Sequence, residues 1–292
     1  MSTYTMQHNG TTPERNTVYA LIYGSVMVLG LPLNVLSLWI LLRYHSFTAP
    51  SIVFMVNLAI SDLLLVISLP MRVYFHATGT WPLRSFACIF ITMLFHNNIR
   101  SSSIFITFIS MDRLLAVVYP LRSRHLRTLA NAWKAVLLIW LFVLVLNVPE
   151  SVLFSKSLNR INETNCFEFS YIPNPSVTPI SFVHTALVLT LLTVNIVCTA
   201  LVSWTLRRHL NESARVNNKV NVMVIFVMNL LMFTIFFLPV SLVVLFGSER
   251  HYRTPLVCLA SMNCCLDPLL YYFSLDGFWK KKEDVEISLA RE

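Results

Sequence analysis

Residues 18–42 read VYALIYGSVMVLGLPLNVLSLWILL, an apolar run without a charged side chain. A helix that crosses the hydrocarbon core of a bilayer needs about 20 mostly apolar residues, and this run is long enough. Further apolar runs with at most one charge each cover residues 51–71, 87–111, 135–149, 180–206, 220–246 and 254–275. The sequence therefore predicts an all-α membrane protein, a bundle of seven transmembrane helices.

The composition supports a membrane location. Of the 292 residues, 12% are charged and 56% are hydrophobic, whereas soluble domains carry about 25% charged residues. These values argue against a soluble cytosolic enzyme, and six cysteines are too few for a disulfide-rich scaffold. The formal net charge of +8 fits a nucleic-acid-binding protein or the cytoplasmic bias of a membrane protein.

The positions of lysine and arginine decide between these two explanations. Taken alternately, one group of connecting segments carries Arg43, Arg113, Arg122, Arg124, Arg127, Lys134, Arg207, Arg208, Arg215, Lys219, Lys280, Lys281, Lys282 and Arg291. The opposite group carries Arg15, Arg84, Lys156, Arg160, Arg250 and Arg253. Because Lys and Arg accumulate on the cytoplasmic side, we expect the richer group inside and the N-terminus outside, with no nucleic-acid partner.

We expect a single membrane domain with short ends. Residues 1–17 form an extracellular segment without a removable signal peptide, 18–275 the seven-transmembrane domain, and 276–292 a cytoplasmic helix and tail. Phe278 and Trp279 precede three lysines, a pattern that favours a short amphipathic helix on the inner leaflet.

Sequons and cysteines agree with this orientation. Asn9 and Asn162 begin glycosylation sequons in segments predicted to be extracellular. Cys88 and Cys166 lie on the same oxidising side and can form a disulfide. The other cysteines lie within spans, where we expect them to act as small apolar residues: Cys198, Cys258, Cys264 and Cys265.

Ordered local motifs resemble the rhodopsin-like class of G-protein-coupled receptors from Val18 to about Lys282. They are Gly-Leu-Pro-Leu-Asn34, Asn57 to Asp62, Met-Asp112-Arg113-Leu, Trp140, Phe233 to Pro239, and Asp267-Pro-Leu-Leu-Tyr271. Within that class the chain is similar to the purinergic-like branch, through Ser68-Leu-Pro-Met-Arg72, Trp81-Pro82, Tyr119 to Arg122 and Asn263 to Pro268. It looks most like the lysophosphatidic acid receptors of that branch, which share the arginine after Ser-Leu-Pro. The resemblance implies a plasma-membrane receptor that activates heterotrimeric G proteins.

The chain departs from this pattern in several places. Leu114 stands where most members have tyrosine after Asp-Arg, and Thr199 stands where many have tyrosine. Residues 180–206 contain no proline, and Pro239 and Pro268 are close enough in sequence to require a very tight turn between spans six and seven. A receptor that signals poorly is therefore one alternative.

Two intramembrane arginines are candidate ligand anchors. Arg72 and Arg100 are costly in a bilayer without a partner, and Glu150 is the only acidic residue nearby in the outer halves of the spans. A phosphate would supply the missing charge through paired hydrogen bonds. As alternatives, Arg72 snorkels to water, and Arg100 binds span-five carbonyls or acts structurally through Asn97 and Asn98.

The remaining candidate ligand contacts are Phe95, His96, Val240 and Val244. Because an amine receptor would carry aspartate where Phe95 stands, a monoamine is disfavoured. An apolar cavity with a cationic rim suits a phosphate head with an acyl tail. Alternative ligands are a nucleotide, another lysophospholipid or a small carboxylate, and a transporter is the alternative from another class. No metal-ligand spacing or nucleophile–base set indicates an enzyme.

The resemblance also implies roles for buried polar and cytoplasmic residues. Asp62, Ser102, Asn263 and Asp267 correspond to a sodium pocket; a protonated, hydrogen-bonded carboxyl pair is the alternative. The residues implied in activation and G-protein coupling are Asp112, Arg113, Phe237, Pro239 and Tyr271. Pro239 would permit the outward swing of span six because it removes a helix hydrogen bond.

Overall fold

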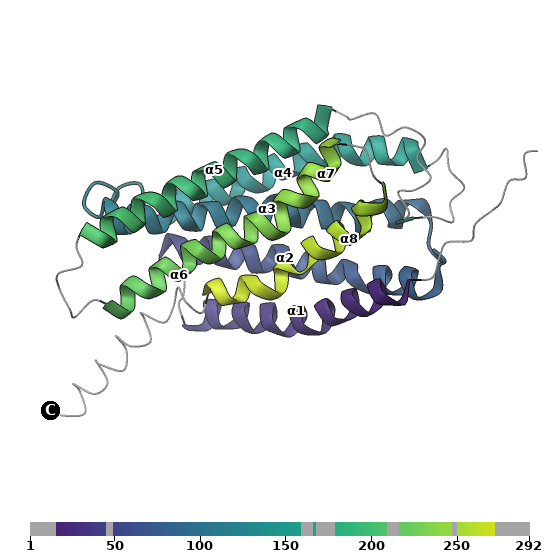
Figure 1. Cartoon of the computed structure of the whole chain (residues 1–292), viewed down its shortest axis with the longest axis horizontal. Coiled ribbons are helices and arrows are strands. Elements are labelled where there is room, and N and C mark those ends of the chain that lie inside the picture. The colour runs from purple at the N-terminus through teal and green to yellow at the C-terminus, as the bar shows by residue number, and fades with distance from the viewer. Residues whose placement is uncertain are drawn as a thin grey trace, which may run out of the picture.

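The computed structural model describes residues 16–44, 49–158, 166–167, 179–208, 216–246 and 250–271, and Figure 1 shows their helices lying lengthwise, side by side. Within these ranges, six helical stretches are long and apolar enough to cross a membrane. The first five helices are α1 (Thr17–Tyr44), α2 (Pro50–Thr78), α3 (Ser85–Val118), α4 (Leu129–Leu158) and α5 (Pro179–Arg208). The predicted glycosylation sites Asn9 and Asn162 and the predicted helix after span seven lie outside the described residues.

The fourth span is longer than the sequence indicates. Its predicted range of 135–149 ends at a proline, but α4 continues through Pro149 to Leu158. Membrane helices tolerate an internal proline because neighbouring groups satisfy the freed backbone. Glu150 therefore lies inside the helix, where its side chain faces a neighbouring span.

The sixth and seventh spans are each interrupted. The sixth consists of α6 (Val216–Met232), a π-helical turn η3 (Phe233–Phe237) and α7 (Leu238–Phe246). The N–H of Leu238 donates to the carbonyl of Phe233, so the wider turn ends at Phe237, two residues before Pro239. Such turns often mark functional sites in helices. The seventh span is α8 (Arg250–Ser261), a turn at Met262 and a further helix over 263–271.

The helices pack in a closed bundle with α3 at its centre. In Figure 1, α1 lies beside α2 at one side and α5 lies at the other. α3 packs against α2, α4, α5 and α6, and α8 closes the bundle by contacting both α1 and α7. α2 and α3 bury most of their polar side chains, so the interior of the bundle is where a polar site can form.

Buried amides and close packing hold the spans together. The Nδ2 of Asn34 in α1 donates to the carbonyl oxygen of Cys264 at 2.7 Å, and the indole Nε1 of Trp140 in α4 donates to Asn57 in α2 at 2.9 Å. Gly30 permits the close approach of α1, because a Cβ there would lie 3.1 Å from the sulfur of Cys264. Small residues and shared hydrogen bonds are the usual basis of helix association in membranes.

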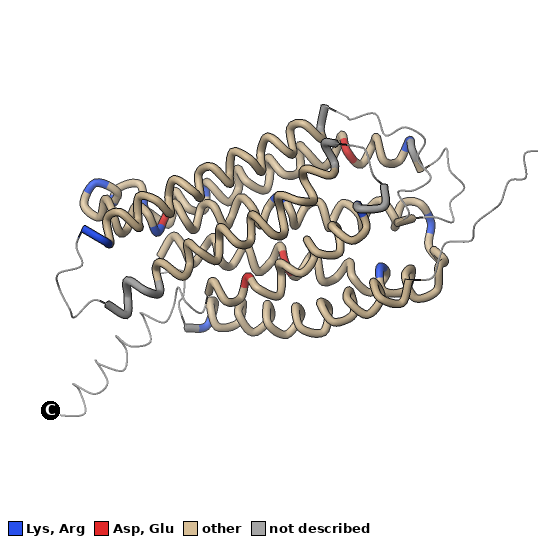
Figure 2. The backbone as a smooth tube through the Cα atoms, viewed as in Figure 1, with Lys and Arg blue, Asp and Glu red and all other residues tan. Residues whose placement is uncertain are grey.

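Among the residues that the structure describes, most lysines and arginines lie towards the two ends of the bundle, as Figure 2 shows, with few charged residues between them. α1 begins beside the last turn of α2, where the N–H of Asn16 donates to the carbonyl of His76 at 3.0 Å. We call this end, which also contains Cys88, the disulfide end. The opposite end, where α3 finishes shortly after Arg113, is called the Arg113 end.

Candidate functional site

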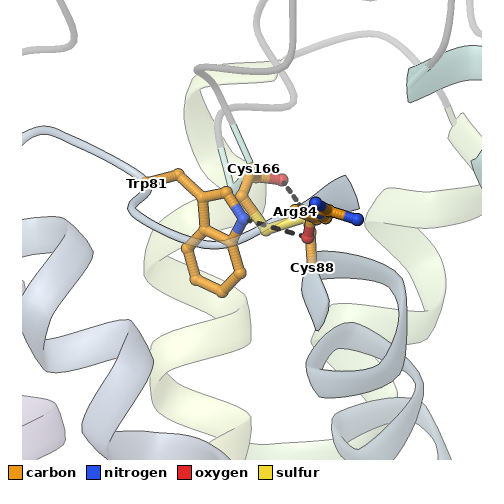
Figure 3. Close-up of a disulfide and its surroundings, with 4 residues drawn as sticks. All are labelled: Trp81, Arg84, Cys88 and Cys166. Carbon is orange, nitrogen blue, oxygen red and sulfur yellow. Dashed lines mark hydrogen bonds between the residues drawn. A yellow bond between two sulfur atoms is a disulfide. The ribbon is translucent and has the colours of Figure 1, made fainter. Parts of the chain in front are cut away.

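A disulfide joins Cys88 at the start of α3 to Cys166, with Cα atoms 5.6 Å apart, which confirms the predicted pairing. Figure 3 shows Trp81 beside this bond, and its indole nitrogen donates to the carbonyl of Arg84 at 3.5 Å. Phe167, the residue that follows Cys166, packs edge-on against Trp81, with ring centroids 5.4 Å apart. The disulfide therefore fixes an aromatic side chain over this end of the bundle.

Arg72 lies beside Phe167, near the end of α2. Its side chain is only 2% exposed, so the alternative of an arginine that snorkels to water does not describe its position. The guanidinium carbon of Arg72 lies 4.6 Å from the ring centre of Phe167, 5.1 Å from that of Phe95 and 5.9 Å from that of Tyr23. The positive charge of Arg72 is therefore surrounded by aromatic rings inside the bundle.

No carboxylate neutralises Arg72 within the part of the chain that the structure describes. The ion pairs in that part are formed by His96, Arg100 and Arg127 instead. The Nε of Arg72 is also buried without a hydrogen-bond partner in these ranges. A buried cation without a counter-charge is costly in a membrane. This arrangement suits a site that an anionic group completes.

Arg100 differs from Arg72 because its counter-charge comes from the protein. Its guanidinium donates to Asn147 and forms an ion pair with Glu150, both on α4. The Nδ1 of His96 lies 3.1 Å from the other carboxylate oxygen of Glu150, and Asn147 donates to Asn97 at 3.3 Å. The structure does not show the alternative contact with a broken span five, since α5 is a continuous helix.

The remaining predicted ligand contacts lie in different surroundings. Phe95 and Val240 are buried, and the ring of Phe95 faces Arg72 directly. His96 is partly exposed and faces Glu150. Val244 belongs to α7, but its side chain lies outside the described residues. Phe95 is therefore the member of this set that the structure brings to Arg72.

A buried polar cluster surrounds Asp62 in the middle of α2. Asn98 donates to Asp62 Oδ1 at 2.9 Å, and Ser102 does so at 3.5 Å. Asp62 Oδ2, both carboxylate oxygens of Asp267 and both polar side-chain atoms of Asn263 are buried without a partner in the described ranges. Unsatisfied oxygens at such a density fit a bound cation or water.

At the Arg113 end, the two adjacent charged residues have separate partners. Asp112 accepts two hydrogen bonds from Arg127, at 2.8 and 3.1 Å. Arg113 donates to the hydroxyl of Ser51 in α2 at 3.1 Å. Although Asp112 directly precedes Arg113, the hydrogen bond that the structure shows for the Arg113 guanidinium goes to a serine.

The other residues implied in activation lie in the spans that meet this interior. Phe237 is buried in η3, with its ring 5.3 Å from that of Phe233 in an edge-on arrangement. Pro239 follows in α7. Tyr271 is buried, and its hydroxyl has no hydrogen-bond partner among the described residues.

A second polar network joins three spans and was not predicted. Ser110 in α3 donates to Asn195 in α5 at 2.7 Å and accepts from Asn229 in α6 at 2.6 Å. Asn195 also donates to Thr107 at 2.8 Å. These side chains link the helices whose relative movement the resemblance associates with activation.

Sequence reasoning missed several residues that complete these sites: Tyr23, Asn147, Phe167 and Asn195, and it missed the contact of Asn98 with Asp62. Phe167 had a usable signal, because it follows a cysteine expected to pair with the start of span three. The buried asparagines also had one, since an amide inside an apolar run needs a hydrogen-bond partner. Neither signal identifies which partner is reached.

Comparison with known proteins agrees with this architecture. The model of the 7 transmembrane receptor (rhodopsin family) matches residues 33–271. Lysophosphatidic acid receptor 6 of Gallus gallus is 32% identical over 282 residues, covering 89% of this chain and 91% of that protein. Lysophosphatidic acid receptor 5 of Bos taurus is 34% identical over 283 residues, covering 89% and 77%. Lysophosphatidic acid receptor 4 of Homo sapiens is 31% identical over 281 residues, covering 89% and 75%. The chain belongs to the rhodopsin family of seven-transmembrane receptors.

Proposed function

We propose that this receptor binds an anionic lysophospholipid, lysophosphatidic acid or a close analogue, and passes the signal to a heterotrimeric G protein. The observation that carries the proposal is Arg72, a buried cation surrounded by rings and without a carboxylate partner in the described ranges. Family membership makes the chain a multi-pass receptor of the plasma membrane rather than an enzyme.

The chemistry of Arg72 favours a phosphate head group. A planar guanidinium offers paired N–H donors that match phosphate oxygens, and such charge-assisted hydrogen bonds are strong. Phe95 and Val240 provide apolar surface suited to an acyl tail. Relatives named lysophosphatidic acid receptor support the same ligand class. Arg100 already has Glu150 as its counter-charge, so we assign the anchor to Arg72.

We assign the disulfide end to the extracellular side and the Arg113 end to the cytoplasm. A disulfide forms in an oxidising compartment. The basic residues at the ends of α1 and α5 and between α3 and α4 match the cytoplasmic bias of membrane proteins; they are Arg43, Arg122, Arg124, Arg127, Arg207 and Arg208. In this orientation the ligand neutralises Arg72 from outside, and outward movement of the sixth span gives the G protein access to Arg113.

We further propose that Asp62, Ser102, Asn263 and Asp267 hold a sodium ion in the resting receptor. The unsatisfied oxygens of Asp62, Asp267 and Asn263 are the type of ligand that a hard cation prefers. Asn98 belongs to the same site because it orients Asp62 by donating to Oδ1. When bound, the ion supplies positive charge that offsets the buried carboxylates.

The test is G-protein activation in cells that express the receptor with an N-terminal tag. Cells receive lysophosphatidic acid or, in parallel, nucleotides, and antibody binding to the tag on intact cells measures both surface level and orientation. We expect a saturable response to the lipid. Arg72→Gln removes the charge-assisted hydrogen bonds and is expected to lower potency about 10- to 100-fold at normal surface level.

Arg84→Gln is the matched control, because Arg84 is an exposed arginine at the same end of the bundle. It is expected to retain the potency of the parent receptor. A response to nucleotides alone would replace the ligand assignment. Equal potency of Arg72→Gln and the parent receptor would remove Arg72 as the anchor.

A further inference from the structure

Three aromatic side chains enclose Arg72: Tyr23, Phe95 and Phe167, which we call the aromatic cage. We propose that the aromatic cage positions Arg72 for the ligand, with Phe167 as its extracellular wall. This inference rests on the proposed function, since it assigns a role to the surroundings of the same anchor.

The two phenylalanine rings of the cage stabilise the arginine without using its donors, whereas the hydroxyl of Tyr23 lies close enough to Arg72 to interact with it as a hydrogen-bonding group. The negative faces of aromatic rings attract a cation that lies over them. A carboxylate would instead occupy the N–H groups, as Glu150 does on Arg100. A guanidinium carries five N–H donors and no acceptor. The phenylalanine rings can therefore compensate the charge of Arg72 while its Nε–H group, which has no hydrogen-bond partner in the described ranges, stays available to a phosphate oxygen.

Two rings of the cage are held by further aromatic packing. Phe167 meets Phe75 edge-on, with centroids 5.3 Å apart, and it meets Trp81 in the same manner at 5.4 Å. His76 stacks on Tyr23, with centroids 5.5 Å apart and an interplanar angle of 14°. Edge-on and stacked pairs at these separations are favourable. These rings are thus fixed before any ligand arrives.

The cage also joins three separate parts of the fold. Tyr23 comes from α1, Phe95 from α3, and Phe167 from the segment that the Cys88–Cys166 disulfide ties to α3. Residues that lie far apart in sequence therefore converge on one guanidinium. Holding that group in a single orientation lowers the ordering cost of ligand binding.

The experiment compares Phe167→Leu, which removes the ring, with Phe167→Tyr, which retains it. Potency of lysophosphatidic acid in G-protein activation is measured together with surface level. We expect Phe167→Leu to lower potency about 2- to 30-fold, the range for one cation–π contact. Phe167→Tyr is expected to retain the parent potency.

Phe86→Leu is the matched control. Phe86 lies on α3 at the same end, is 77% exposed, and stacks on Phe90 rather than on a cation. We expect no change in potency from this substitution. Equal potency of Phe167→Leu and the parent receptor would overturn the role of the cage, and so would an equal loss in Phe167→Tyr and Phe167→Leu.

A double substitution separates this inference from the proposed function. If Phe167 acts through Arg72, Phe167→Leu causes no further loss in the Arg72→Gln receptor. Full additivity of the two losses would show that Phe167 acts independently of Arg72 and overturn the inference. If Arg72→Gln leaves no measurable response, the comparison of Phe167→Leu with Phe167→Tyr decides alone. An Arg72→Gln receptor with unchanged potency would instead contradict the proposed function.

Discussion

Arg72 and Arg100 are both 2% exposed, yet their surroundings give them different chemistry. Arg100 has a carboxylate and an amide from α4, so its charge and several of its donors are already used. Arg72 has rings on its faces and no such carboxylate in the described ranges. A buried charge pair that loses one partner is destabilised, because the remaining charge is left uncompensated. The two arginines should therefore respond differently to substitution.

Glu150→Gln tests the structural role of Arg100. The change leaves Arg100 buried without its counter-charge, and we expect the free energy of unfolding to fall by about 1–3 kcal/mol, less than for a fully buried pair because Glu150 is partly exposed. The measurement is the melting temperature of the purified receptor. The double variant Arg100→Gln/Glu150→Gln should recover part of the loss, since it leaves no unpaired charge. Equal melting temperatures for Glu150→Gln and the parent receptor would show that the pair contributes no stability.

At the level of whole elements, the polar network between α3, α5 and α6 is placed to control activation. Asn229 of α6 donates to Ser110 of α3, and the same hydroxyl donates to Asn195 of α5. The π-helical turn η3 follows α6 and gives the sixth span a point of weaker helical bonding. Outward movement of α6 would break the Asn229–Ser110 hydrogen bond, so this bond favours the resting state.

Asn229→Ala should raise signalling in the absence of ligand. A neutral hydrogen bond contributes about 0.5–1.5 kcal/mol, which shifts the equilibrium towards the active state about 2- to 10-fold. The measurement is basal G-protein activation, normalised to surface level. Thr190→Val is the control, because the exposed hydroxyl of Thr190 donates to the carbonyl of Ala186 within α5. Basal activity that stays at the parent value in Asn229→Ala would exclude this network as a restraint on α6.

The positions of the spans could be predicted because the length of each apolar run specifies them. The contacts between the spans could not be predicted in this way. The run over residues 18–42 lies within a helix, and so do its counterparts as far as the structure describes them, apart from the turn at Met262. The end of α4 was misplaced because Pro149 breaks soluble helices but not this one. One alternative for Arg100 is a structural role through Asn98, yet Asn98 donates to Asp62, because rotation of α3 decides which neighbour an amide reaches. Rotation depends on packing between spans, which a single sequence does not contain.

Across the whole molecule, α2 connects the three functional regions. Ser51 binds Arg113, Asp62 lies in the polar cluster, and Arg72 lies in the aromatic cage. Because an α-helix rises 1.5 Å per residue, Asp62 lies about 15 Å along α2 from Ser51 and about the same distance from Arg72. Asp267 and Tyr271 of the seventh span lie close enough to Asp62 to interact with its charge. The polar cluster is thus placed to couple the two ends of the bundle.

This position predicts that sodium lowers the affinity for the agonist. The proposed sodium ion at Asp62 and its neighbours would stabilise the resting state. Two sites that favour opposite states weaken each other's binding, typically about 5- to 150-fold. Agonist affinity should be measured in membranes in sodium chloride and in choline chloride at equal ionic strength, because salt also screens the contact of Arg72 with phosphate. Asp62→Asn removes the charge that holds the ion and should abolish the difference between the two salts. If the parent receptor binds agonist equally in both salts, the cluster is better described as a protonated carboxyl pair, and coupling between the two ends then depends on hydrogen bonds such as Asn98–Asp62 alone.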